Sequence, residues 1–263
     1  MDKSQIESYK ENGYIILEKI FTPEEVNKYK NEISYFEDKK KLPNVICEDN
    51  KIRSIFAPHM DSQVYADLYK DSRLLNVAQK LVKENLYLYQ YKLNLKEPFL
   101  GKWWEWHQDY PYWHFDDGVA SPDMTSAMIY LDDAKSFQGP LMVIPGSHKE
   151  GIAKFKEKNT LDKNDILNSL SSNLKFTVDD SIVKAYADQN GIEVLELKAG
   201  SVVFFHPNLF HASTGNLSPY ERDTVIITYN SINNLPVSEN KRPDYICSTD
   251  NSVLTESDEL CNL

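Results

Sequence analysis

Positive charge, long apolar runs and cysteine are all scarce in this sequence, and each shortage excludes a class of protein. The chain of 263 residues carries a net charge of −11. Nucleic acids and anionic membranes bind basic surfaces, so neither is an expected partner. No run reaches the roughly 18 apolar residues of a membrane-spanning helix, and the first residues contain no apolar signal region. We therefore expect a cytoplasmic protein.

The three cysteines, Cys47, Cys247 and Cys261, are scattered and odd in number. They form neither a CxxC pair nor a disulfide framework, which agrees with a reducing compartment. Internal repeats, low-complexity tracts and obvious linkers are missing as well. We therefore expect residues 1–263 to form one domain, because single β-barrel domains of this size are common.

The first third of the chain has the pattern of helices. Thr22 is a helix cap, Pro23 occupies the first turn, and Glu25 completes a capping box, so a helix is predicted from here to Ile33. A second helical pattern covers roughly residues 62–82, with its apolar side chains on one face. Residues 1–85 are therefore predicted to be mainly helical.

Short β-rich segments dominate from residue 86 onwards, and glycine and proline pairs separate them as turns. The predicted strands cover residues 86–94, 125–131, 141–144, 193–197, 201–205 and 224–229. A polar stretch from about 162 to 190 is expected to be helical. Many short strands with such turns are typical of a sandwich or barrel. We place the barrel core at residues 86–235 and a C-terminal tail at 236–263.

Two histidines and one aspartate form the most informative pattern. His107 and Asp109 stand two residues apart, and His211 follows much later. On a strand, residues i and i+2 share a face. We therefore expect His107 and Asp109 to point together into the barrel mouth, with His211 supplied by a distant strand. Two imidazoles and a carboxylate, without thiolates, suit iron(II) and leave coordination positions open for chemistry.

His206 is a rival for the third ligand, since it ends the apolar run 202–205 and precedes Pro207. We favour His211, because Arg222 follows it at a suitable distance. The remaining histidines have weaker claims and are expected at surface or core positions: His59, His114 and His148. Of these, His114 lies close enough to the metal motif to touch a substrate.

Arg222 stands at the start of an apolar segment. A guanidinium in such a place is costly unless it is paired, and its planar fork matches a carboxylate. The distal carboxylate of 2-oxoglutarate would be that partner. An ordinary surface ion pair is the alternative for an isolated arginine, and the metal pattern favours the first interpretation. Trp106, beside the first metal ligand, is expected to shield the site from water.

These motifs together resemble the phytanoyl-CoA dioxygenase family, and within it the ectoine-hydroxylase-like branch. The matching segments are residues 89–94, 106–114, 117–118, 139–148 and 211–216, with Arg222 and residues 229–230. The resemblance implies a mostly β fold, a double-stranded β-helix (cupin-like jelly roll) preceded and flanked by helices. It also implies Fe(II) at His107, Asp109 and His211, with 2-oxoglutarate and O2 as cosubstrates.

The same resemblance assigns roles to residues around the iron. By position, Arg222 and Ser213 would hold the distal carboxylate of 2-oxoglutarate, and Asn94 would contact the cosubstrate. Gln90 and Trp113 would line the substrate side.

The residues expected around the substrate indicate a small polar molecule. The expected wall consists of Gln90, Tyr91, Lys92, Tyr112 and Trp113, with the acids Asp116 and Asp117. Lys92 would pair with a carboxylate of the substrate, and Asp116 or Asp117 with an amine or guanidine. That combination suggests a free amino acid or a derivative.

Departures from the ectoine hydroxylases fall on this substrate side. Those enzymes carry Arg where this chain has Lys92, and Thr where it has Tyr112. Their R-P-x-x-x-x-x-R pattern near the C-terminus begins here at Arg242 but ends in Thr249. We therefore expect a substrate other than ectoine.

The sequence thus predicts a dioxygenase that hydroxylates an unactivated C–H bond and releases succinate and CO2. Two alternatives stay open. One is a metal-dependent enzyme of another type on a cupin-like barrel, such as a zinc hydrolase or isomerase. The other is a barrel that binds a ligand without catalysis. A monomer and a homodimer are equally compatible with the sequence.

Overall fold

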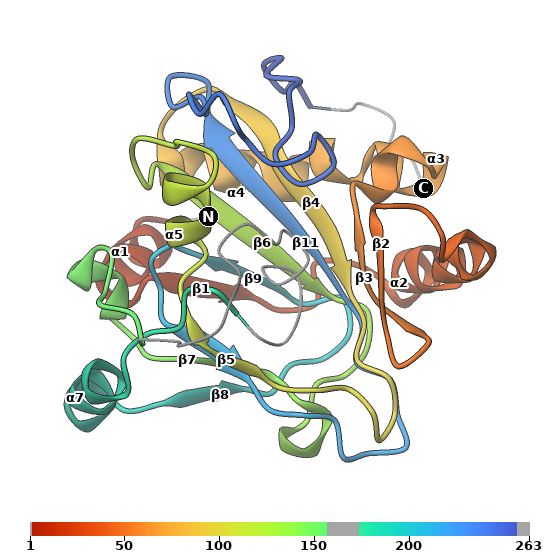
Figure 1. Cartoon of the computed structure of the whole chain (residues 1–263), viewed down its shortest axis with the longest axis horizontal. Helices are drawn as coiled ribbons and strands as arrows, with labels where there is room; N and C mark the ends of the chain where they lie inside the picture. Colours follow the sequence, from red (N-terminus) through yellow and green to blue (C-terminus); the bar gives the residue numbers. More distant parts are fainter. Residues whose placement is uncertain (1, 157–173, 257–263) are drawn as a thin grey trace.

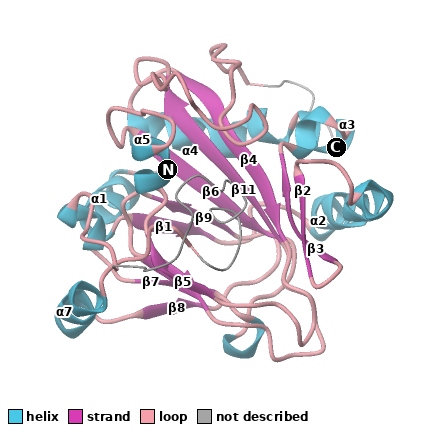
Figure 2. Ribbon diagram, in the orientation of Figure 1, coloured by secondary structure: helices cyan, strands magenta, loops and turns pink. Residues whose placement is uncertain are grey.

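A computed structural model describes residues 2–156 and 174–256. Its centre is a pair of antiparallel sheets that face each other, with helices on the outer side of the larger one (Figure 1, Figure 2). The larger sheet has the order β1 (Tyr14–Leu17), β9 (Val202–Phe205), β6 (Met124–Tyr130), β11 (Thr224–Ser231), β4 (Leu86–Asn94), β3 (Lys51–Phe56) and β2 (Val45–Glu48). The smaller has the order β5 (Trp104–His107), β10 (His211–Ser213), β7 (Leu141–Val143) and β8 (Glu193–Leu195). This is the predicted jelly roll.

Six α-helices lie in the described residues: α1 (Lys3–Asn12), α2 (Pro23–Glu32), α3 (Gln63–Ala66), α4 (Ser72–Val82), α5 (Tyr110–Phe115) and α7 (Asp180–Asn190). Short 3-10 helices cover Ile33–Lys39, Pro58–Met60, Leu68–Lys70, Ser136–Gln138 and Ser147–Glu150. Within the described residues, no helix has both the length and the apolar character needed to cross a membrane.

Alternation along the central strands builds a separate core on each face of the large sheet. In β9, Val202 and Phe204 pack into the cluster beneath the helices, whereas Val203 and Phe205 pack between the two sheets. Successive side chains of a strand point to opposite faces, so one apolar run supplies both layers.

The strand β4 uses the same alternation for a different purpose. Tyr91 and Leu93 join the core beneath the helices. Gln90, Lys92 and Asn94 face the other way and line cavities between the sheets. A row of polar side chains therefore faces the small sheet.

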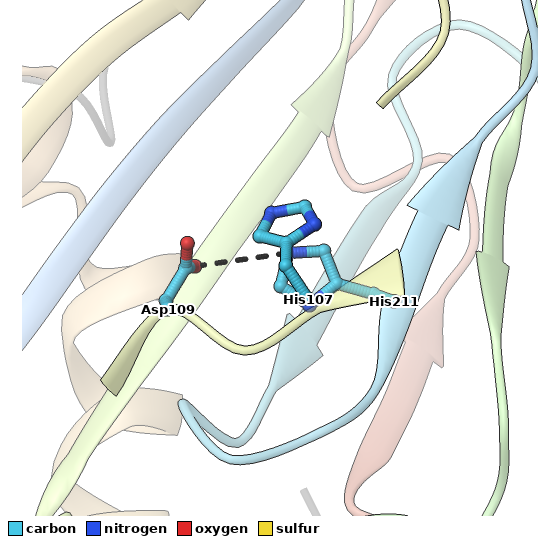
Figure 3. Close-up of side chains that lie close together, drawn as sticks. All are labelled: His107, Asp109 and His211. Carbon is cyan, nitrogen blue, oxygen red and sulfur yellow. Dashed lines mark ion pairs between the residues drawn. The ribbon is translucent and has the colours of Figure 1, made fainter. Parts of the chain in front are cut away.

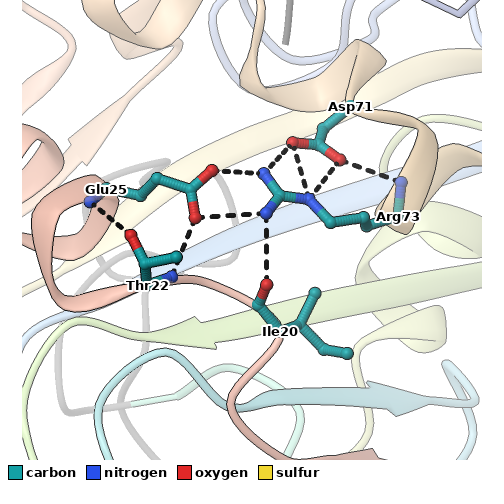
Figure 4. Close-up of polar contacts among 5 residues, drawn as sticks. All are labelled: Ile20, Thr22, Glu25, Asp71 and Arg73. Atoms are coloured by element: carbon teal, nitrogen blue, oxygen red, sulfur yellow. Dashed lines mark hydrogen bonds and ion pairs between the residues drawn. The ribbon is translucent and has the colours of Figure 1, made fainter. Parts of the chain in front are cut away.

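The helices α2 and α4 are tied together through Arg73. Its guanidinium donates to the carboxylates of Asp71 and Glu25, each at 2.6 Å, and to the Ile20 carbonyl at 3.1 Å (Figure 4). Thr22 and Glu25 form the predicted capping box at the start of α2. The helix α4 in turn packs on β6 and β11.

Most of the predicted elements are confirmed, including the helix at Thr22 and the strands in all six β-rich segments. The first part, predicted to be mainly helical, also contains three strands that the prediction lacked, because β1, β2 and β3 belong to the large sheet. The β2–β3 hairpin turns at Asp49 and Asn50, both with positive φ, which is the conformation of a tight hairpin turn. The predicted helix over 62–82 is interrupted, and Asp71 caps a new start at α4.

Of the helix predicted from about 162 to 190, the described residues contain only the last part, since residues 174–179 are not helical. Residues 180–190 form α7 as expected, whereas residues 162–173 lie outside the described residues. The C-terminal segment is not a free tail. The amides of Ser248 and Leu254 donate to the carbonyls of Tyr89 and Leu86, at 3.0 and 2.8 Å, so this segment runs along the part of β4 that β3 leaves unpaired.

Candidate metal centre

The two histidines lie opposite each other on neighbouring strands of the small sheet. His107 ends β5, His211 begins β10, and the two residues are direct antiparallel partners. Their ring centroids are 4.0 Å apart, and the His211 Nε2 lies 3.9 Å from the Asp109 Oδ2 (Figure 3). One ligand atom from each of the three residues lies within 4.8 Å of the others. The three side chains therefore converge on a space that one metal ion could fill.

Asp109 reaches this place by a different route from the one predicted. The strand β5 ends at His107, and Asp109 has helical φ and ψ at the start of α5. The amides of Asp109 and Tyr110 both donate to the carbonyl of Pro207, at 3.0 Å each. The expectation that His107 and Asp109 share one strand face was wrong, since the strand ends between them. The turn held by the Pro207 carbonyl instead directs the Asp109 carboxylate towards the two histidines.

Backbone carbonyls fix the orientation of both imidazoles. The Nδ1 of His107 lies 2.6 Å from the Glu105 carbonyl oxygen, and the Nδ1 of His211 lies 2.9 Å from that of Leu209. A carbonyl can only accept, so each Nδ1 carries the proton and donates it. Each Nε2 is then left with its lone pair, the arrangement typical of metal-bound histidines.

The charge states also suit a cation. Burial, with the neighbouring His211, lowers the pKa of His107 to about 3 and keeps its ring neutral. Burial by itself would raise the pKa of Asp109, but Lys92 and the two histidines outweigh it and lower the pKa. Two neutral imidazoles and one carboxylate are the donor set of non-haem iron(II) sites with open positions. The donor set therefore fits iron(II).

A cavity lies between the two sheets and includes the three candidate ligands in its wall. Among the predicted cosubstrate residues, Asn94, Ser213 and Arg222 also line it. Its apolar wall is formed by Trp104, Met128, Leu141, Phe205, Ala212 and Ile226.

Two buried basic side chains lie close together here: Arg222 lines the cavity, and Lys96 lies behind Ser213 in its wall. Arg222 is 3% exposed, and its Nη1 donates to Thr224 Oγ1 at 3.3 Å while its Nε has no hydrogen-bond partner. Lys96 is also 3% exposed, and its Nζ donates to Ser213 Oγ at 2.8 Å and to the Thr214 carbonyl. Neither cation forms an ion pair within the described part of the chain.

An unpaired pair of buried cations is energetically unfavourable. Burial lowers the pKa of Lys96 to about 5, with further repulsion from Arg222 and Arg53. The site is nonetheless built closely around the amine. A Cβ added to Gly139, which has a φ of +69°, would lie 2.8 Å from the Lys96 Nζ and 2.5 Å from the Thr214 carbonyl. Such a site lacks a negatively charged partner for its basic side chains, and a bound anion would supply it.

A second cavity adjoins the first and shares His107, Asp109, Lys92 and Asn94 with it. It contains the predicted substrate residues Gln90, Tyr112 and Trp113. The structure adds Ser54, Phe56, Trp104, Leu174 and Arg242 to its wall.

Four residues predicted for the site lie outside both cavities. Trp106 packs with the cluster around Ile144 and Phe210, away from both cavities. Tyr91 is on the helix-covered face of the large sheet. Asp117 is fully buried and paired with Arg242. Asp116, the alternative acid, is bound to Lys175 at 2.6 Å.

The other histidines stay outside the cavities. The Nδ1 of His206 accepts from the Asn208 amide at 3.1 Å, and its ring packs on His148 at 5.1 Å between centroids. His114 lies 2.9 Å from the Val119 carbonyl through its Nδ1, and the His59 ring stacks on Tyr91. The preference for His211 over His206 therefore agrees with the geometry.

The sequence reasoning missed Trp104 and Arg242 as cavity residues, and Lys96 as the residue that binds Ser213 in the cavity wall. Lys96 had a usable signal, since it extends the period-two row of Gln90, Lys92 and Asn94 by one step. Arg242 had none that local sequence could provide, because it arrives from a segment distant in the chain.

Comparisons with known proteins agree with this geometry. The family model described as phytanoyl-CoA dioxygenase (PhyH) matches residues 9–224. Ectoine dioxygenase of Bordetella bronchiseptica is 33% identical over 260 residues, covering 94% of this chain and 82% of that relative. L-proline trans-4-hydroxylase of Streptomyces griseoviridis is 32% identical over 253 residues, covering 95% of this chain and 94% of that relative.

A solved structure, EctD from S. alaskensis with 2-oxoglutarate and 5-hydroxyectoine, is similar throughout. It superposes with a TM-score of 0.83 at 29% identity, covering 98% of this chain and 87% of that one. A match to the family model over most of the sequence, two curated relatives above 30% identity and a shared fold lead to one conclusion: the chain belongs to the phytanoyl-CoA dioxygenase family.

Proposed function

We propose that this protein is an Fe(II)- and 2-oxoglutarate-dependent dioxygenase that hydroxylates an unactivated C–H bond of a small polar metabolite. A free amino acid or an amino-acid derivative is the substrate class that we favour. The names of the relatives support this class, because one acts on ectoine and the other on L-proline. The small cavity and its mixed polar and aromatic wall support it as well.

In this proposal His107, Asp109 and His211 hold the iron through two Nε2 atoms and a carboxylate oxygen. Arg222, Lys96 and Ser213 hold the distal carboxylate of 2-oxoglutarate, and Asn94 contacts the same molecule. One observation supports the assignment above all others. Buried Arg222, which has no counter-ion in the described residues, lines the cavity that also contains the metal ligands, and buried Lys96 donates to Ser213 in the same wall. A dicarboxylate that reaches from the metal to these cations would satisfy both ends.

Iron and 2-oxoglutarate, once bound, supply the oxidising chemistry: O2 contributes one oxygen atom to succinate and one to the new hydroxyl group, and CO2 leaves. The chain supplies placement. Apolar Met128, Leu141 and Phe205 limit the access of water to the cosubstrate end. The second cavity must hold the reacting C–H near the metal, at a near-attack distance of roughly 3–3.5 Å.

The direct test is a turnover screen with iron, 2-oxoglutarate and O2 over amino acids and small compatible solutes. We expect at least one compound to stimulate succinate release and to gain one oxygen atom, as measured by mass spectrometry. His107→Ala should abolish both signals, whereas the matched control His148→Gln should retain them, since His148 lies outside the cavities. Product formation without O2 consumption would instead indicate a metal-dependent hydrolase or isomerase.

Other features of this proposal rest on composition alone. Action without nucleic-acid or anionic-membrane partners is proposed from the acidic net charge of −11. A cytoplasmic location is proposed from the few, scattered cysteines. Cys47 and Cys247 are both free thiols, which is compatible with a reducing compartment.

A further inference from the structure

The cavity on the substrate side contains a cation with no partner. Lys92 lies in the middle of β4 and lines both cavities. Its ammonium group forms no hydrogen bond or ion pair with any residue in the described ranges. The ammonium group of Lys92 can stay hydrated here only because it faces the open space of the cavities. Lys92 is therefore available to a ligand in a way that the other side chains around it are not.

Arg242 is a second cation in the wall of the same cavity. Its Nε and Nη2 both donate to Asp117, with the shortest distance 2.6 Å from Nη2 to Oδ2. No hydrogen bond uses its Nη1 within the described residues. Burial would lower the pKa of Arg242, but its hydrogen bonds to Asp117 outweigh burial and raise it. One edge of the guanidinium is thus fixed in place, and one nitrogen remains for a ligand.

Asp117 is fully occupied by these contacts. Its carboxylate also accepts from the Tyr89 hydroxyl at 2.5 Å and from the Arg242 amide at 3.1 Å, and the residue is 0% exposed. Asp116 is held by Lys175. The two acids that were expected to recognise a substrate amine therefore cannot do so without breaking buried bonds.

The charges that line the cavity consequently have an excess of one sign. The charged side chains in its wall are Lys92, Arg242 and Asp109. Under the proposed function Asp109 is committed to the metal. Among the described residues, the charged groups left for the substrate are then two cations, and no second carboxylate of the wall balances them.

We propose that the substrate carries a carboxylate and that Lys92 and the Nη1 of Arg242 bind it, with Asp117 acting as a positioning residue that holds Arg242. This inference deepens the proposed function and rests on it. It differs from the expected recognition of an amine by Asp116 or Asp117, because neither acid belongs to the described part of the cavity wall. A substrate with a carboxylate and a neutral or amide nitrogen is accommodated as well as an amino acid.

Binding to the iron- and 2-oxoglutarate-loaded protein without O2, measured by calorimetry, tests this assignment. The probes are small carboxylic acids and their primary amides, among them L-proline, L-prolinamide and N-acetyl-L-proline. We expect acids to bind at least about 10-fold more tightly than their amides, since a charge-assisted bond is lost. Acetylation of the nitrogen should leave the preference for the acid in place.

Two variants locate the effect. Lys92→Gln should weaken acid binding by about 10- to 100-fold and remove the preference over amides, whereas Lys92→Arg should restore most of it. The matched control is Lys80→Gln, an exposed lysine on α4. The 2-oxoglutarate affinity of Lys92→Gln should equal that of the wild type.

Each contrary result has a distinct meaning. If no acid in the panel binds more tightly than its amide, the anion subsite is wrong. If Lys92→Gln weakens 2-oxoglutarate instead, Lys92 serves the cosubstrate and the assignment fails. If acetylation abolishes binding across acids of different size, an amine is recognised and the role of Asp117 is wrong. Failure of the wild type to bind iron and 2-oxoglutarate at all would contradict the proposed function itself.

Discussion

Arg222 and Arg242 are both buried at the central cavities, at 3% and 8% exposure, yet they meet opposite electrostatic conditions. Arg242 has a fully buried carboxylate, Asp117, bound to two of its nitrogens. Arg222 has no carboxylate within ion-pair distance in the described residues. A second basic side chain, Lys96, lies close enough for the charge of Arg222 to lower its pKa. Arg242 is therefore held in place by the protein itself and keeps only its Nη1 for a ligand. The missing partner of Arg222 indicates a site for an anion.

The largest effect is expected where the partner is built in. Asp117→Ala leaves Arg242 buried without a counter-ion, and breaking a buried pair in this way costs about 3–5 kcal/mol. The free energy of unfolding of the metal-free protein, measured with urea, should fall by this amount. Asp188→Ala is the control, because its pair with Lys184 is exposed and should cost at most ~0.5 kcal/mol. Similar losses in both variants would remove the distinction between the two arginines.

Arg222→Met should show the opposite pattern. Removing a buried cation that lacks a partner should leave the stability of the metal-free protein unchanged or increased. The affinity for 2-oxoglutarate should fall by about 2–4 kcal/mol, since the carboxylate loses its guanidinium. Urea unfolding of the metal-free protein checks the stability, and titrations with 2-oxoglutarate and with iron check the two affinities. A parallel loss of iron binding would mean that Arg222 supports the metal site instead.

Lys96 makes the comparison sensitive to pH. Its pKa is lowered to about 5 in the folded protein without a ligand, against roughly 10.4 in an unfolded chain. The unfolded state binds more protons between these values, so this group makes stability rise with pH across that window. Binding of a dicarboxylate near pH 7 should restore the charge and take up close to one proton.

Calorimetry in buffers with different ionisation enthalpies measures this uptake. We expect it to disappear in Lys96→Met, together with about 10- to 100-fold of the 2-oxoglutarate affinity. Uptake that persists unchanged in the variant would show that another group gains the proton.

Ser213→Ala should have the smallest effect. The Ser213 hydroxyl accepts from Lys96 at 2.8 Å, so its loss removes one support of the cation and one polar contact to the carboxylate. We expect about 1 kcal/mol of 2-oxoglutarate affinity to be lost, with no change in iron affinity. An effect as large as that of Arg222→Met would mean that the hydroxyl, rather than the guanidinium, dominates recognition.

The strand pattern and the metal ligands were readable from sequence for a physical reason. Period-two alternation and turn residues are local signals, and they located β4, β6, β9 and β11 with small boundary errors. The same rule placed Gln90, Lys92 and Asn94 on one face of β4, and it should have excluded Tyr91, which points to the other. That error came from grouping aromatic residues by composition rather than by strand geometry.

What the sequence could not provide were contacts between remote segments. The route of Asp109 depends on the Pro207 carbonyl, and the occupation of Asp117 depends on Arg242. Neither partner is near in sequence, and no periodicity predicts them. The strands β1 to β3 were missed because they are short and lie among helical patterns. Substrate chemistry was therefore the part most altered by the structure.

The most direct test of the central claim is an anaerobic titration of 2-oxoglutarate into the iron-loaded protein, followed by visible absorption. The cavity with His107, Asp109 and His211 at one end and Arg222 with Lys96 nearby should bind one 2-oxoglutarate per iron, with a saturable charge-transfer band. Arg222→Met should need far more 2-oxoglutarate to reach the same band. A folded, iron-loaded protein that shows no band, or an Arg222→Met variant that titrates like the wild type, would contradict the claim.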